Sequence, residues 1–65
     1  MQNTLNTVME LLSFYDLRLE PGDYCSLSIV GGGNLEFGTC YHGMIESFRD
    51  IDVAVAWLKK VLDVP

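Results

Sequence analysis

The run Gly31-Gly32-Gly33-Asn34 limits the possible folds of this chain more than any other stretch. Glycine adopts positive φ without steric cost and asparagine tolerates it, so the run suits a tight chain reversal. Apolar and polar residues alternate on both sides of the run, as they do in half-buried strands. The run therefore predicts the tip of a β-hairpin. A phosphate-binding loop is excluded, because such loops lead directly into a helix and a strand follows here.

The same alternation predicts the strand register. One face carries Cys25, Leu27 and Ile29 before the turn and Leu35, Phe37, Thr39 and Tyr41 after it. Pairing Ile29 with Phe37 puts both sets on one apolar face and leaves Gly32-Gly33-Asn34 as a three-residue loop. A shift by one residue would oppose Cys25 and Cys40 and permit a disulfide, but it would bury the carboxylate of Glu36. We therefore expect two free thiols on opposite faces of the sheet.

Segments with helical periodicity lie on both sides of the hairpin. The first runs from about Asn3 to Tyr15, with either Asn3 or Thr4 as its cap and Thr7–Glu10 as an alternative capping box. Its predicted apolar stripe consists of Leu5, Val8, Met9, Leu12 and Tyr15. Phe14 projects to the opposite side, so either the helix has frayed before this residue or its aromatic ring is exposed and contacts something outside the chain.

The second helical segment follows a start signal at Ser47 or at Asp50, and its terminal charges complement the helix dipole. Its predicted core stripe consists of Ile51, Ala54, Val55, Leu58, Val61 and Leu62. Val53 and Trp57 widen the apolar arc to about 200°, which exceeds what one sheet face requires. We expect the first helix or another subunit to cover this additional surface.

These elements predict a single α+β domain spanning residues 1–65, of order α-β-β-α, with both helices on one face of an antiparallel hairpin. Residues 16–23 connect the first helix to the hairpin through a Pro21-Gly22 turn, and Leu17–Leu19 can form a short third strand. A domain of this size buries only about 60% of the surface of its unfolded chain, so its stability is marginal. Oligomerisation is the aid that the composition favours.

Composition narrows the functional classes. Nine acidic and four basic residues give a formal net charge of −5, and no cluster of basic residues is present for direct nucleic-acid binding. The longest apolar stretch, Val53–Leu58, is too short to span a membrane. With two cysteines and no recognisable secretory signal, we expect a cytoplasmic protein. The acidity serves solubility, or alternatively makes the chain an inhibitor or nucleic-acid mimic that blocks a basic site on a larger protein.

No catalytic, metal or cofactor site is predicted. Cys40 and His42 are neighbours on one strand face, which is a weak indication of a thiol-dependent enzyme, and with Glu36 they supply at most three metal ligands. Two surfaces are predicted to bind a protein partner. The helix exteriors contribute Phe14, Val53 and Trp57, and the open sheet face contributes Tyr24, Glu36, Cys40 and His42. The leading hypothesis is a small acidic, non-enzymatic interaction module that forms homo-oligomers.

Overall fold

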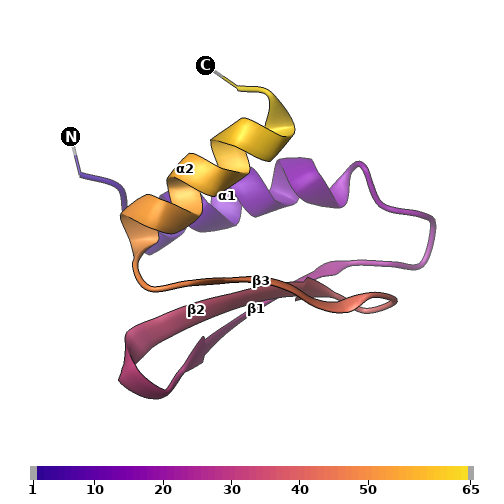
Figure 1. Cartoon of the computed structure of the whole chain (residues 1–65). Helices are drawn as coiled ribbons and strands as arrows, with labels where there is room; N and C mark the ends of the chain where they lie inside the picture. Colours follow the sequence, from indigo (N-terminus) through magenta and orange to yellow (C-terminus); the bar gives the residue numbers. More distant parts are fainter. Residues whose placement is uncertain (1, 65) are drawn as a thin grey trace.

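The computed structural model describes residues 2–64 and has the element order α-β-β-β-α (Figure 1). The elements are α1 (Leu5–Asp16), β1 (Cys25–Val30), β2 (Asn34–Thr39), β3 (Gly43–Phe48) and α2 (Ile51–Leu62), with a short 3₁₀ turn, η1, at Gly31–Gly33. The strands form one antiparallel sheet in the order β1-β2-β3, and both helices lie on one side of it. The predicted α+β class, hairpin and placement of the helices are confirmed.

The third strand is not where the sequence suggested. Leu17–Leu19 forms no strand, and the predicted second strand ends at Thr39 instead of continuing to His42. The chain turns at residues 40–42, and β3 then runs back along β2. A β-bulge interrupts this strand, because Phe37 pairs with Glu46 and Gly38 with Met44, and the intervening residue of β3 has no partner. The bulge breaks the alternation of apolar and polar residues by which a strand is predicted from the sequence.

The hairpin has the predicted faces but a different pairing. Ile29 lies opposite Leu35 rather than Phe37, and the three-residue loop is Gly31–Gly33 rather than residues 32–34. The loop requires positive φ at Gly32 (80°) and Gly33 (83°), whereas Asn34 has a φ of −66° and continues the strand. Glycines therefore occupy the two positions whose positive φ is costly for other residues, and Asn34 is the first residue of β2. Both cysteines are free thiols, as predicted.

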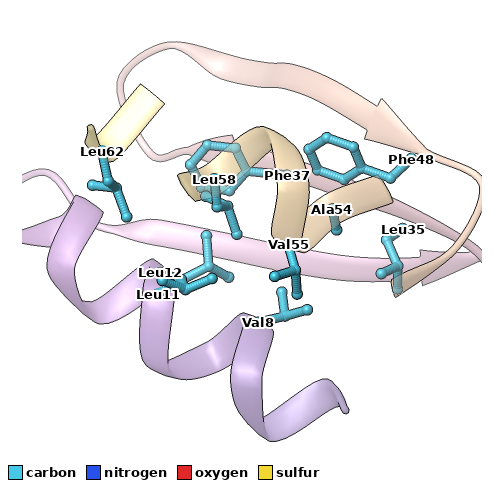
Figure 2. Packing of buried hydrophobic residues seen from close by; sticks show 10 residues of the cluster. All are labelled: Val8, Leu11, Leu12, Leu35, Phe37, Phe48, Ala54, Val55, Leu58 and Leu62. Carbon is cyan, nitrogen blue, oxygen red and sulfur yellow. The ribbon is translucent and has the colours of Figure 1, made fainter. Parts of the chain in front are cut away.

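The hydrophobic core lies between the helices and the inner face of the sheet (Figure 2). Its buried residues are Val8, Leu11, Leu12, Leu35, Phe37, Phe48, Ala54, Val55, Leu58 and Leu62. The Trp57 ring packs on Phe37 and Phe48, with ring centroids 5.9 and 5.4 Å apart. The Trp57 part of the wide apolar arc of α2 is therefore covered by the sheet rather than by α1, while Val53 stays exposed.

Helix α1 is turned slightly from its predicted orientation. Leu11 is buried, while the predicted stripe residues Leu5 and Met9 are exposed. The reason is that α1 packs against α2 as well as against the sheet, so its buried face is centred between these two neighbours. The rotation leaves apolar side chains of α1 in contact with solvent.

The ends of the two helices are connected by polar contacts. Thr4 caps α1 and Asp50 caps α2, each accepting from the backbone N–H three residues later at 3.4 and 2.9 Å. At the other end, the Arg18 guanidinium donates to the carbonyl oxygens of Val61 and Leu62, both at 2.9 Å. Carbonyls at a helix C-terminus carry partial negative charge, so this arginine holds the end of α2 beside the end of α1.

Candidate interaction surface

The residues predicted for the open sheet face do not form one site. Tyr24 and Cys40 are neighbours at the end of the sheet, where the Cys40 N–H donates to the Tyr24 carbonyl at 3.0 Å. The pKa of the Tyr24 hydroxyl is raised, chiefly by its hydrogen bond with the Cys40 thiol and then by the charge of the thiolate. Glu36 lies further along the same face, in β2.

The predicted pairing of Cys40 and His42 on a strand face is wrong. Both residues belong to the exposed turn between β2 and β3, and the His42 N–H donates to the Thr39 hydroxyl at 3.1 Å. Residues of a tight turn do not share the alternating geometry of a strand. Within residues 2–64, no group of three or more histidine, cysteine, aspartate or glutamate side chains is arranged to hold a metal ion. Over the same residues, neither helix has the length and apolar content needed to cross a bilayer.

The three residues predicted for the helix exteriors lie on two helices and differ in exposure. Phe14 and Val53 are exposed, on α1 and α2 respectively. Trp57 is half-buried and turned toward the sheet, where Phe37 and Phe48 contact it. Trp57 therefore acts mainly in the core and is a poor candidate for the centre of an interface.

The structure shows a surface that sequence reasoning missed, at the outer edge of the sheet. Strand order makes β1 and β3 the two edge strands. Edge strands commonly carry a bulge or a charged side chain that discourages pairing with another chain. β3 has both, because the bulge interrupts it and Glu46 lies in it. β1, with the sequence Cys-Ser-Leu-Ser-Ile-Val, has no bulge, proline or charge.

The backbone groups along the outer edge of β1 can be assigned from the hydrogen-bond pattern. The bond from Cys40 to Tyr24 marks a hydrogen-bonded pair, and such pairs alternate along an antiparallel ladder. The N–H and C=O groups of Cys25, Leu27 and Ile29 therefore point away from β2. The Cys25 N–H donates to the Asp16 carboxylate at 2.9 Å. No hydrogen bond from the described residues reaches the outward groups of Leu27 or Ile29.

Apolar side chains lie beside these backbone groups. Ile29 is on the helix side of the sheet and yet is 64% exposed, and Met9 of α1 is 51% exposed. A depression of about 190 Å³ between α1 and β1 is lined in part by Met9, Leu12 and Leu27. We call the outward backbone of Leu27 and Ile29, together with the exposed side chains of Leu5, Met9 and Ile29, the β1 edge surface.

The titratable groups at this depression are Cys25, Asp16 and Tyr24. The Cys25 thiol contacts the Leu12 carbonyl oxygen at 3.7 Å, and its burial, followed by the charge of Asp16, raises its pKa to about 11. The thiol is therefore protonated at neutral pH and is a poor nucleophile. The Asp16 carboxylate already accepts the Cys25 N–H. These groups make the depression a better contact surface than a reaction site.

The sequence gives one indication of this surface, the absence of charge in residues 24–30. In a two-stranded hairpin each strand has a free edge, so the sequence does not show that β1 stays an edge strand while β2 becomes the central one. Only the presence of β3 makes β2 central and β1 the unprotected edge. Comparisons with protein-family models, with curated proteins and with solved structures find no match to the chain.

Proposed function

We propose that the chain is a non-enzymatic protein-interaction module that self-associates through the β1 edge surface. The observation that carries the proposal is an uncharged six-residue edge strand whose outward groups at Leu27 and Ile29 have no partner among the described residues. Pairing with a further strand supplies main-chain hydrogen bonds, and the adjacent apolar side chains add burial. A 65-residue domain of marginal stability gains from such an association.

The acidity of the chain receives a partly structural explanation. Among residues 2–64, five carboxylates accept hydrogen bonds from backbone or amide groups, namely those of Asp16, Asp23, Glu46, Asp50 and Asp52. Carboxylates that cap helices and order turns need no basic partner to account for them. This favours self-association over the alternative of an inhibitor that mimics nucleic acid. Two free thiols suit a reducing compartment, so we propose the cytoplasm as its location.

Sedimentation velocity over a wide concentration range tests the proposal, in the presence of a reductant because Cys40 is exposed. The wild type should shift from monomer to a larger species as concentration rises. Ile29→Lys should abolish the shift, since an edge lysine introduces a charge that opposes strand pairing. Met44→Lys is the matched control, because Met44 is 63% exposed and lies in the opposite edge strand.

The proposal is contradicted by a wild type that stays monomeric up to the highest soluble concentration. It is also contradicted if Met44→Lys disrupts association as strongly as Ile29→Lys. Circular dichroism of both variants establishes that each retains the fold, so that a change in sedimentation reports on the interface.

A further inference from the structure

We infer that the β1 edge surface binds β1 of a second copy of this chain, antiparallel to it, with Ser28 on the two-fold axis. This inference rests on the proposed function and specifies its partner and geometry. The two sheets would join into one of six strands, with all four helices on the same side. Helix α1 of each copy lies closest to the junction, because α1 is the helix that packs on β1.

The register follows from which backbone groups remain free. If Leu27 pairs with Ile29 of the second copy, two-fold symmetry also pairs Ile29 with Leu27 of the second copy. The outward N–H and C=O groups of all four residues are then hydrogen-bonded across the junction. A register centred on Leu27 would instead require the Cys25 N–H, which Asp16 already occupies. The contact of Asp16 with Cys25 therefore ends the pairing at one side and selects the register centred on Ser28.

Charge at the junction permits a second copy of an acidic chain. The protein carries a net charge of −5, but β1 has no charged residue, and the exposed α1 side chains of the β1 edge surface are apolar. No carboxylate lies in the paired strands themselves: that of Glu36, opposite Ser28, belongs to β2, and that of Asp16 accepts the Cys25 N–H of its own chain. A strongly basic partner would find little to attract it at this edge.

The contact area indicates a weak dimer. β1 is about 20 Å long at 3.3 Å per residue, and the shortest dimension of the molecule is 16 Å. A junction of this length and depth covers roughly 320 Å² on each copy, about 640 Å² in total, which is below the range for standard specific complexes. We therefore expect association at micromolar or higher concentrations, with fast exchange between monomer and dimer.

A disulfide placed on the axis tests the register. Ser28 bonds to β2 on its inner side, so across the junction it forms a non-hydrogen-bonded pair with its own counterpart. The Cα atoms of such a pair are about 4.5 Å apart, within the ~4.4–6.8 Å that disulfides span. Ser28→Cys, with Cys25 and Cys40 both changed to serine, should oxidise to a covalent dimer. Ser26→Cys is the control in the same background, because the two Ser26 positions lie about 13 Å apart along the strands.

Each outcome distinguishes the inference from the proposed function. Rapid oxidation of Ser28→Cys, absent in Ser26→Cys and slowed more than ten-fold by adding Ile29→Lys, supports the register. If Ser26→Cys cross-links instead, the register is wrong and the proposed function stands. The same holds if neither variant cross-links while the wild type associates and Ile29→Lys stays monomeric. A wild type that never associates overturns both.

Discussion

At the scale of single residues, Gly38 has the least space for a side chain among the glycines. A Cβ at this position would lie 2.3 Å from the carbonyl oxygen of Gly43 and 2.8 Å from its carbonyl carbon. Both are backbone atoms of β3 next to the bulge, so they cannot move away as a flexible side chain can. We expect Gly38→Ala to lower the free energy of unfolding by about 1–3 kcal/mol, as overpacking does in well-packed interiors. Urea denaturation followed by circular dichroism measures it.

Gly31→Ala is the control for this substitution. No atom lies within 4 Å of a Cβ at Gly31, and its φ is not positive. The free energy of unfolding should change by less than about 0.5 kcal/mol, as for surface substitutions elsewhere. Equal stability of the two variants would show that β3 does not approach β2 as closely as described.

The Cys25 thiol should stay protonated to a higher pH in the folded chain than in the unfolded chain. Burial and then the charge of Asp16 raise the pKa of the Cys25 thiol from 9.0 to about 11. Between these values the unfolded chain loses the thiol proton while the folded chain keeps it, so stability is retained below pH 9 and falls as pH rises toward 11. In a Cys40→Ser variant, the alkylation rate of Cys25 should rise with a midpoint near 11, and Asp16→Asn should move that midpoint downward. A midpoint at 9.0 with Asp16 present would contradict this account.

At the scale of elements, periodicity identified both helices and the hairpin because each presents one apolar face to a single core. The caps at Thr4 and Asp50 follow from local chemistry, since a side-chain oxygen there reaches an N–H three residues later. The turn before β1 was equally local: Gly22 has a φ of 91°, and the Asp23 N–H donates to the Glu20 carbonyl at 3.0 Å. Features decided within four residues could be predicted from the sequence.

Features that depend on distant contacts could not. The bulge opposite Phe37 and Gly38 removes the period-two pattern from β3, so periodicity does not predict that strand. Without β3, Phe48 cannot be placed beside Trp57, and Trp57 is left as surplus apolar surface on α2. For the same reason the unprotected edge at β1 could not be recognised. A single missed strand thus accounts for both differences between the predicted surfaces and the structure.

At the scale of the whole molecule, the charged side chains lie outside the β1 edge surface that we propose as the contact between copies. The chain carries a net charge of −5, whereas the β1 edge surface consists of backbone groups and apolar side chains. Two copies therefore repel each other at long range, and the attraction that we propose is confined to the place where β1 meets β1. Salt screens the repulsion, with a Debye length of about 10 Å at 0.1 M, and it affects backbone hydrogen bonds and apolar contact much less.

This separation predicts how self-association responds to ionic strength. Raising sodium chloride from low to high concentration should lower the dissociation constant of the dimer several-fold, because only the repulsive contribution is weakened. Sedimentation equilibrium at several salt concentrations measures the effect, with Ile29→Lys as a variant that should stay monomeric at each. An acidic inhibitor held to a basic partner would behave in the opposite way, since screening removes the attraction that binds it. A dimer that dissociates as salt is added would therefore place its contact on charged groups and exclude the β1 edge surface as the interface.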